Sequence, residues 1–280
     1  MNKICAILVS HNRVSRIDSI VTSLLNQTHQ FENIIIIDNN SSDGTAEYLR
    51  KLDNPAIKVI CLNYNAGHGA SIAIGLNSTD LNEFDYYFFV EDDSSIKNDL
   101  VNQLIFKSLN YPKYDLIGSS GSIYSLGRKK RIKSSTEMIE VNFTVFSGLL
   151  IKSQVFKAIG VPVGDFFMMC DDLEFCMRAV KNGFKIGIID LDMHEALHLG
   201  SVSSSTSTIW RSYYQSRNRI LILKRQMSLY NFLDCIIWET KFLYSSLINN
   251  SPLKRIRYRL LGIFDGIIGR KGFTVDPKKF

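Results

Sequence analysis

The sequence has few cysteines, and none of the five lies at the paired spacing that zinc sites and disulfide frameworks require. We therefore expect free, buried thiols of the kind found in a reducing cytosol. The chain also lacks a long apolar run. The nearest candidate for a membrane span, residues 229–248, contains charged residues and is typical of an amphipathic helix. The first residues begin a strand pattern at once, without the apolar core and cleavage site of a signal peptide.

Two further absences narrow the function. The loop that follows the first apolar segment, residues 10–13, contains no glycine. We expect a sugar-nucleotide pyrophosphorylase to carry a glycine-rich phosphate loop there. A pyrophosphorylase is therefore an alternative function that this loop disfavours. The chain has no recognisable nucleic-acid-binding motif and few aromatic residues placed for base stacking, so we predict no nucleic-acid partner.

The composition is that of an ordinary globular protein, with 45% hydrophobic and 21% charged residues. A length of 280 residues fits one large α/β domain or a domain with an extension. The net charge of +6 is unevenly distributed: residues 209–280 carry +10 and the rest of the chain carries −4. The basic character therefore belongs to the tail.

Strand and helix patterns alternate through the first hundred residues. Short apolar segments bounded by polar loops are typical of buried strands. Strands joined through helices predict a parallel, doubly wound α/β sheet. The expected strands are residues 4–9, 33–37, 57–62 and 86–90, and the expected helices are residues 15–25, residues 45–52 and a helix that ends at Leu76.

Four polar loops follow these strands. Because ligands bind beyond the carboxyl ends of the strands in such sheets, we predict that the loops form one crevice. For any single loop, a strand end followed by a helix cap is an equally good explanation, since Ser, Asn and Asp are ordinary cap residues. The loops are residues 10–13, 38–43, 65–69 and 91–93.

The most informative of these loops is the acidic turn, defined here as Glu91, Asp92 and Asp93, which ends an aromatic and apolar strand. Carboxylates at the exposed end of a buried strand suit a divalent cation and a phosphorylated ligand. The alternative is a simple acidic turn that caps the next helix.

The second half of the chain is less regular. We expect strands at residues 115–119, 145–151 and 185–189. Gly148, in the second of these, allows the close approach of a ligand or of another backbone. The basic residues 128–133 are interpreted as an exposed loop, with contact to a phosphate-bearing substrate as the alternative.

A helix is predicted to begin near Asp171 and to stop at Gly183. Asp171 followed three residues later by Glu174 is close to a capping-box signal. Asp172 then lies in the first helical turn, where the helix dipole stabilises its ionised form and keeps it available as a proton acceptor. The alternative is that both aspartates only cap the helix.

We predict that the basic tail is a helical extension of the domain. Basic and apolar residues interleave at 254–259, as in a segment that seeks a surface. Together with the amphipathic segment 229–248, this suggests that the tail holds the chain near anionic lipids or a lipid-diphosphate acceptor. Packing of the tail on the core, or a contact between the subunits of a homo-oligomer, is the alternative.

Taken together, these features resemble the family 2 inverting glycosyltransferases, which have an A-type, Rossmann-like nucleotide-sugar-binding fold. The likeness covers roughly the first 100 residues and lies in residues 7–13, residues 37–45, the Asn65-Ala66-Gly67 element and the acidic turn. Later elements are similar to the subgroup that contains bacterial galactofuranosyl- and rhamnosyltransferases. These elements are residues 171–175, His198, and residues 213–218.

The resemblance implies a site for the donor and for a metal ion. The residues implied for the uracil or other pyrimidine base are Val9, His11, Arg13 and Asp38, and those beside the nucleotide are Asn65 and Gly67. The acidic turn matches the family's aspartate-any-aspartate motif, in which the last aspartate holds the metal and the earlier positions serve ribose and metal. This implies Glu91 and Asp92 at the ribose, and Glu91, Asp93 and His198 around Mn²⁺ or Mg²⁺.

Two positions need comment. Glu91 stands where the family usually has aspartate, and its longer side chain could still reach a cation. Asp172 matches the family's general base.

The residue types suit this chemistry. A divalent cation held by carboxylates neutralises the charge that builds up on a leaving nucleoside diphosphate, and Asp172 can take the proton of the attacking hydroxyl. A single in-line attack inverts the anomeric centre, and one carboxylate suffices because the diphosphate leaves without an acid. We therefore predict a metal-dependent inverting glycosyltransferase that uses a UDP- or dTDP-sugar.

The resemblance suggests galactofuranose or rhamnose as the sugar, and a glycan or lipid-linked hydroxyl as the acceptor in the synthesis of cell-surface polysaccharide such as O-antigen or capsule. We expect a catalytic domain at residues 1–208, with a nucleotide-binding half (1–100) and an acceptor-side half (101–208), and an extension at 209–280. The expected location is the cytoplasmic face of the membrane. A non-catalytic nucleotide-sugar-binding or scaffold protein is the other alternative.

Overall fold

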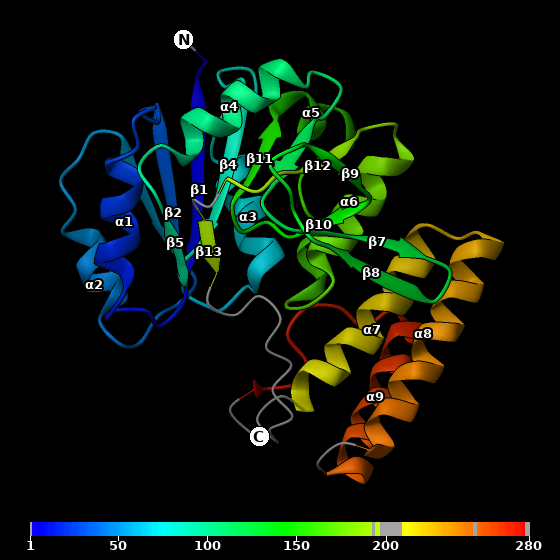
Figure 1. Ribbon diagram of the computed structural model, residues 1–280. Helices are drawn as coiled ribbons and strands as arrows, with labels where there is room; N and C mark the ends of the chain where they lie inside the picture. Colours follow the sequence, from blue (N-terminus) through cyan, green and yellow to red (C-terminus); the bar gives the residue numbers. More distant parts are fainter. Residues whose placement is uncertain (1, 192–193, 197–208, 249–250, 278–280) are drawn as a thin grey trace.

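The computed structural model describes residues 2–191, 194–196, 209–248 and 251–277. Within these residues, eight strands form a central sheet in the order β3-β2-β1-β4-β11-β6-β12-β9 (Figure 1). Only β11 and β9 run antiparallel to their neighbours in it. The strands are β1 (Ile4–Ser10), β2 (Asn33–Asp38), β3 (Ile57–Cys61), β4 (Tyr86–Glu91), β6 (Leu116–Gly118), β9 (Ile139–Val141), β11 (Leu149–Lys152) and β12 (Ile186–Ile188).

Helices cover both faces of this sheet (Figure 1). Side chains alternate between the faces along a strand, and in β1 both sets are apolar: Ile4 and Leu8 join one buried core, and Ile7 joins the other. The first core contains residues of α1 (Ile17–Leu25), α2 (Thr45–Arg50) and α4 (Leu100–Asn110). The second contains residues of α3 (His68–Asn77), α5 (Ser153–Ile159) and α6 (Asp171–Lys181).

The predicted doubly wound, mostly parallel α/β fold is therefore confirmed. Strand β1 pairs in parallel with β2 on one side and with β4 on the other. The chain leaves β1 toward β2 and β3, and then returns to β4 on the opposite side. The strand order thus reverses between β1 and β4, which is the place where doubly wound sheets bind ligands.

Two predictions about the second half were wrong. Residues 128–132 are not a loop: they form strand β8 (Arg128–Ile132), which pairs with β7 (Gly121–Ser125), and β7 also pairs with β10 (Phe143–Thr144). Charge does not prevent this hairpin because the pairing is made by the backbone, while the basic side chains stay exposed. The strand expected from residue 145 begins only at Leu149, because Gly148, with φ +70°, turns the chain first.

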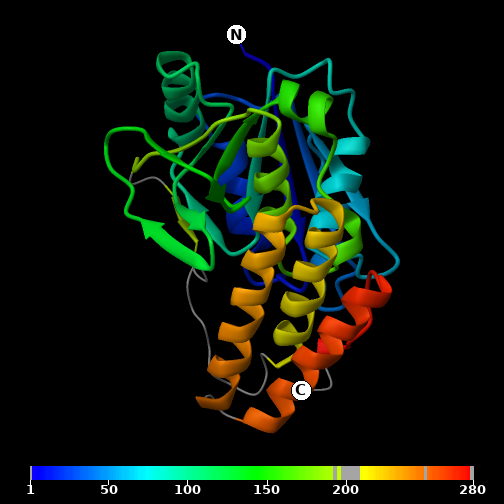
Figure 2. The same ribbon diagram turned by 90° about the vertical axis from the view of Figure 1, so that its right-hand side faces the viewer.

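The tail forms three long helices, α7 (Ile209–Arg225), α8 (Leu229–Ile248) and α9 (Pro252–Ile268), which extend from one end of the domain (Figure 2). Helix α9 lies against the backbone of α7. A Cβ atom at Gly262 would lie 2.4 Å from the carbonyl oxygen of Tyr213, and one at Gly266 would lie 2.8 Å from that of Arg217. Of the helices that the structure describes, none has the length and apolar character needed to cross a bilayer.

Candidate functional site

The acidic turn lies at the carboxyl end of β4, beside the ends of β1 and β2. Glu91 pairs with Val9 across β4 and β1, and Asp38 pairs with Ser10 across β2 and β1. The parallel sheet thus brings the acidic turn together with the loops at residues 10–13 and 38–43.

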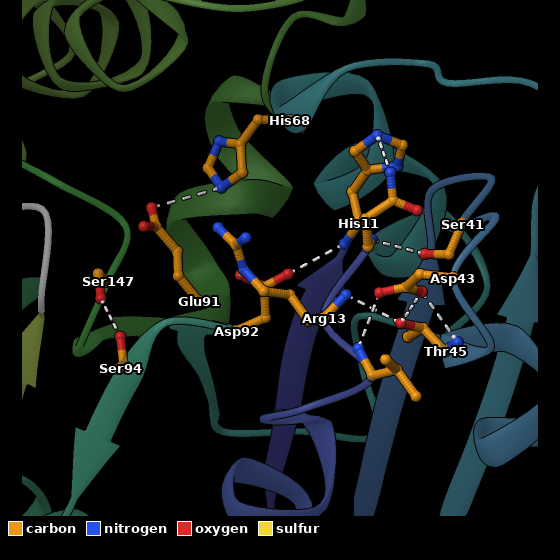
Figure 3. A network of polar contacts seen from close by, with 12 residues as sticks. His11, Arg13, Ser41, Asp43, Thr45, His68, Glu91, Asp92, Ser94 and Ser147 are labelled. Atoms are coloured by element: carbon orange, nitrogen blue, oxygen red, sulfur yellow. Dashed lines mark hydrogen bonds and ion pairs between the residues drawn. The ribbon is translucent and has the colours of Figure 1, made fainter.

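Asp92 holds the loop that follows β1 (Figure 3). Its Oδ2 accepts a hydrogen bond from the backbone N–H of His11 at 3.0 Å, and its Oδ1 accepts one from Nε of Arg13 at 2.9 Å. Burial raises the pKa of Asp92, and the contacts with His11 and Arg13 offset part of this effect. The structure thus places Asp92 in contact with two of the residues predicted to bind the pyrimidine base of the donor.

Two asparagines connect the third loop to this group. Nδ2 of Asn39 donates to Oδ1 of Asn65 at 3.0 Å, and Oδ1 of Asn39 accepts from the backbone N–H of Ala66 at 2.8 Å. The carbonyl oxygen of Asn39 lies 2.9 Å from Nδ1 of His11. These bonds fix the loops after β1, β2 and β3 relative to one another.

Asp38 is 1% exposed, and its Oδ2 accepts a hydrogen bond from the backbone N–H of Ser41 at 3.1 Å. The other oxygen is buried and has no hydrogen-bond partner in the described part of the chain. Gly67 lies at φ +87° against the backbone of Phe167, where a Cβ atom would meet the carbonyl oxygen of Phe167 at 1.9 Å. Only glycine fits that position.

The structure adds His68 to the candidate site, a residue that the sequence did not reveal. It is the first residue of α3 and lies between two carboxylates from distant parts of the chain. Its Nδ1 lies 2.6 Å from Oδ2 of Asp171. Its Nε2 lies 3.6 Å from Oε1 of Glu91, a contact shown in Figure 3. Its only signal in the sequence was its position between two glycines, in one of the polar loops predicted to form the crevice.

The two carboxylates charge this imidazole. Burial alone would lower the pKa of His68, but Asp171 and Glu91 raise it to about 9. Burial raises the pKa of Asp171, and the stronger combined effect of its contacts, led by His68, leaves that pKa below its usual value. At neutral pH the structure thus holds an imidazolium–carboxylate pair between α3 and α6.

Asp172 lies in the first turn of α6, as predicted, and is partly exposed. Its Oδ1 accepts a hydrogen bond from the backbone N–H of Leu173 at 2.8 Å. Burial and the neighbouring charge of Asp171 raise the pKa of Asp172 to about 7. A carboxylate with such a pKa is matched to proton transfer near neutral pH.

The predicted capping box at the start of α6 was wrong. No side chain caps this helix, which begins after Cys170 in a left-handed conformation at φ +66°. Glu174 instead forms an ion pair with Arg178, with Nη2–Oε2 at 2.9 Å, and Asp171 faces His68. A neighbour on the same helix thus occupies Glu174, and a residue of α3 occupies Asp171. The predicted stop at Gly183, which lies just beyond the helix at φ +85°, was right.

Glu91 and Asp93 offer hard carboxylate oxygens, the ligands that Mg²⁺ and Mn²⁺ prefer. Burial and neighbouring carboxylates raise the pKa of Glu91, an effect that His68 partly offsets, so a cation at this turn would relieve repulsion. The described residues contain no group of three His, Cys, Asp or Glu side chains placed to hold a metal ion.

The third predicted ligand, His198, lies outside the described residues. Strand β13 (His194–Ala196) pairs antiparallel with β5 (Ser94–Ile96), and this register places Ala196 opposite Ser94, the residue after Asp93.

A cavity of about 420 Å³ lies between β7, α6, α7 and α8. Its walls are largely apolar, and they include Leu173, the residue next to Asp172. The cavity therefore adjoins the first turn of α6. Other lining residues are Tyr124, Met177, Arg219, Leu223 and Tyr230.

Comparison with known proteins gives a family match. The family described as Glycosyl transferase family 2 matches residues 5–174, which includes the acidic turn and Asp172. The dTDP-rhamnosyl transferase RfbF of Shigella flexneri is 24% identical over 300 residues, covering 97% of both chains. The cholesterol galactosyltransferase of Borreliella burgdorferi is 23% identical over 251 residues, covering 80% of this chain and 68% of that one.

Solved structures share the fold. Residues 1–349 of S. aureus TarS superimpose with a TM-score of 0.62 at 15% identity, covering 95% of this chain and 81% of that one. The same protein in complex with UDP-GlcNAc gives a TM-score of 0.56 at 15% identity, covering 96% and 92%.

The raised pKa of Asp172 predicts a gain in stability for Asp172→Asn. A carboxyl group whose pKa rises from 3.8 to about 7 on folding stabilises the folded state below about pH 4, and this contribution is lost as the pH rises through about 7. The asparagine variant keeps the hydrogen bond to Leu173 without ionising. We expect it to exceed the wild type in free energy of unfolding by a few kcal/mol at pH 8, because each tenfold change in proton affinity corresponds to about 1.4 kcal/mol.

Urea unfolding at pH 4.5, 6 and 8 measures this difference. Asp53→Asn, at an exposed position, is the control and should show a difference near zero at every pH. A difference for Asp172→Asn that does not grow with pH would contradict the assigned environment of this carboxylate.

Proposed function

The chain belongs to glycosyl transferase family 2, and from this premise we propose that it transfers a sugar from a nucleoside diphosphate donor to a hydroxyl group, with inversion at the anomeric carbon. The observation that carries the proposal is the position of Asp172. Asp172 lies in the first turn of α6 and has a pKa of about 7. The residue before it, Asp171, pairs with His68, which in turn contacts Glu91 of the acidic turn.

We propose dTDP-rhamnose as the first donor to test, and UDP-galactofuranose as the second. The name of the Shigella flexneri relative supports the first, and the residues shared with the galactofuranosyl- and rhamnosyltransferase subgroup support both. The UDP-GlcNAc complex of TarS supports a nucleotide sugar in general. The buried, unbonded oxygen of Asp38 supports base binding, because the imide N–H of uracil or thymine is a donor that could satisfy it.

In the proposed reaction, Asp172 accepts the proton of the acceptor hydroxyl as its oxygen attacks the anomeric carbon. Asp92 keeps His11 and Arg13 in place beside the base and ribose, and Asn39 keeps Asn65 in the same group. A divalent cation, Mn²⁺ or Mg²⁺, would supply charge neutralisation for the leaving diphosphate. Glu91, Asp93 and His198 are the residues proposed to hold it.

We propose that residues 1–208 form the catalytic domain and that the acceptor approaches from the side of residues 101–208. The cavity beside Leu173 supports this direction, since Leu173 directly follows Asp172 and the apolar walls suit the lipid part of a lipid-diphosphate-linked glycan. The place of this transfer would be the synthesis of a cell-surface polysaccharide.

We further propose that the helical extension, residues 209–280, attaches the enzyme to the cytoplasmic face of an anionic membrane. Its interior is charged: Arg219, Glu239 and Arg259 are each at most 8% exposed. The guanidinium of Arg219 lies 4.7 Å from the ring centroid of Trp238, and that of Arg259 lies 4.6 Å from the ring centroid of Phe242.

The exterior of the extension is apolar and basic. In the described residues from 209 onward, every exposed charged side chain is basic. Such a surface fits an anionic bilayer, which attracts basic residues and takes up apolar ones. The exposed apolar residues on α8 and α9 include Phe232, Ile236, Leu247, Leu260, Phe264 and Ile268.

A donor panel tests the proposed reaction, with nucleoside diphosphate release measured in the presence of lipid-linked glycan acceptors. We expect Asp172→Asn to abolish transfer and to leave donor affinity within about twofold of wild type, because the side chain acts on the acceptor. Wild-type turnover should fall as the pH falls through about 7, since the base becomes protonated. Normal turnover by the variant would contradict the assignment of Asp172 as the general base. Pyrophosphate-dependent donor breakdown would instead indicate a pyrophosphorylase, and binding without turnover a scaffold.

Asp93→Ala tests the metal site. We expect it to weaken donor binding in the presence of Mn²⁺ at least tenfold and to leave the metal-free affinity unchanged, because the lost carboxylate acts through the cation. Isothermal titration calorimetry with and without Mn²⁺ measures the two donor affinities. Asp80→Ala, which removes a carboxylate outside the site, is the control. An unaltered metal dependence would count against Asp93.

Sedimentation with lipid vesicles tests the membrane surface. We expect the wild type to bind vesicles that contain phosphatidylglycerol, and to bind phosphatidylcholine vesicles much less, with binding reduced by salt. The double variant Phe264→Ser/Ile268→Ser should lose at least tenfold in vesicle affinity, because each serine removes an exposed apolar side chain of α9. Phe106→Ser/Leu109→Ser, at exposed positions on α4, is the matched control.

Two results would refute this membrane surface. One is equal binding by the α9 double variant and the wild type. The other is a wild type that forms a dimer in analytical ultracentrifugation and does not bind vesicles, while the α9 variant is a monomer. The second result would assign the surface to a homo-oligomer.

A further inference from the structure

The loop that leads into α6, residues 166–170, has an unfavourable backbone conformation. Phe167, Met169 and Cys170 all have positive φ values, of 60°, 70° and 66°. None is glycine, and such conformations persist only where the surrounding structure enforces them. Because Asp171 and Asp172 follow directly, whatever holds this loop also determines where the two carboxylates stand.

Asn218 of α7 holds the loop from one side. Its Nδ2 donates to the carbonyl oxygens of Phe166, Met168 and Met169 at 3.1, 2.8 and 2.7 Å. Nη2 of Arg217 donates to the carbonyl oxygen of Phe166 at 2.8 Å. Both side chains are fully buried, so water does not compete for these bonds.

Helix α3 holds the loop from the other side. The backbone N–H of His68 donates to the carbonyl oxygen of Phe167 at 2.9 Å. Gly67 leaves the space that this carbonyl occupies, and a Cβ atom at Gly69 would lie 2.9 Å from Cβ of Asp171. The loop is therefore fixed between the first residues of α3 and the middle of α7.

The segment after α9 completes the support of α7. Nη1 of Arg217 donates to the carbonyl oxygen of Gly272 at 2.7 Å and to Oγ1 of Thr274 at 2.9 Å. The hydroxyl of Tyr214 donates to the carbonyl oxygen of Val275 at 2.9 Å. These bonds fix the guanidinium of Arg217, which in turn fixes its bond to the loop.

We propose that Asn218 and Arg217 are positioning residues for Asp172, and that they act through the loop at residues 166–170. The proposal rests on the proposed role of Asp172 as the base. Neither residue itself contacts the donor loops, and the loop at residues 166–170 reaches them only through its backbone contacts with Gly67 and His68. We therefore expect a larger effect on the proton-transfer step than on donor binding. The Tyr213–Asn218 element, which the proposed reaction does not use, thereby has a role in the same site.

Asn218→Asp tests this proposal. The side chain keeps its shape, but an ionised carboxylate cannot donate to three carbonyl oxygens and is repelled by them. We expect kcat to fall about 10²-fold, since small displacements of a reacting group have effects of that size, with the KM for the donor within about twofold of wild type. The limb of the pH–rate profile assigned to Asp172 should also shift. Hydrogen exchange of the amides of residues 167–172 should become faster.

Gln27→Glu is the matched control. Gln27 is likewise a fully buried amide, and its Nε2 donates to the carbonyl oxygens of Ser23 and Lys97, on the opposite face of the sheet. We expect this variant to lose stability and to keep its pH–rate profile and its exchange rates at residues 167–172. Asn218→Ala, which removes the donors without adding charge, serves in the same assays if Asn218→Asp fails to fold.

Unchanged exchange at residues 167–172 in a folded Asn218 variant would overturn the proposal, as would a kcat within twofold of wild type. A rise in donor KM as large as the fall in kcat would also overturn it. If the wild type transfers no sugar from any donor, the proposed function fails, and the exchange experiment alone then decides whether Asn218 holds the loop.

Discussion

The site depends on one interaction, the pairing of His68 with Asp171 and Glu91. The turn after β4 and the start of α6 each bring carboxylates to the edge of the sheet, and carboxylates this close raise one another's pKa. A buried carboxylate without a cation is costly. The imidazolium, placed by the first residue of α3, lets Asp171 stay ionised inside the protein. Asp172 has no ion-pair partner among the described residues, and it keeps the raised pKa that the proposed base requires.

The sheet and the meeting of its loops could be predicted because their signal is local. Apolar strands with two buried faces alternate with helices, and parallel pairing then brings the polar strand ends to one edge. The contact of His68 with Asp171 joins residues 103 positions apart, and the glycines beside His68 do not indicate this partner. The same limit explains the capping box. Asp171 and Glu174 have the spacing of a cap, but Asp171 pairs with His68, a partner that only the folded chain supplies. Glu174 pairs with Arg178, four residues further along the same helix.

The helical extension shows another limit of sequence patterns. An amphipathic segment was expected at residues 229–248, but its pattern does not say which face turns inward. In the structure, Glu239 and Ser246 of α8 and Arg259 of α9 are buried, while large apolar side chains of both helices face outward. The buried arginines contact aromatic rings and a serine hydroxyl of neighbouring helices. These contacts depend on how the three helices pack.

The close contact of α9 with α7 also has a geometric consequence. Gly262 and Gly266 bring the α9 backbone onto the carbonyl groups of Tyr213 and Arg217, so no side chain lies between the two helices at these points to allow sliding. Arg217 bonds to the loop before α6 as well. A continuous series of close contacts therefore connects α9, through α7 and the loop before α6, to Asp172. If α9 rests on a membrane as proposed, the plane of that membrane sets the angle from which an acceptor reaches Asp172.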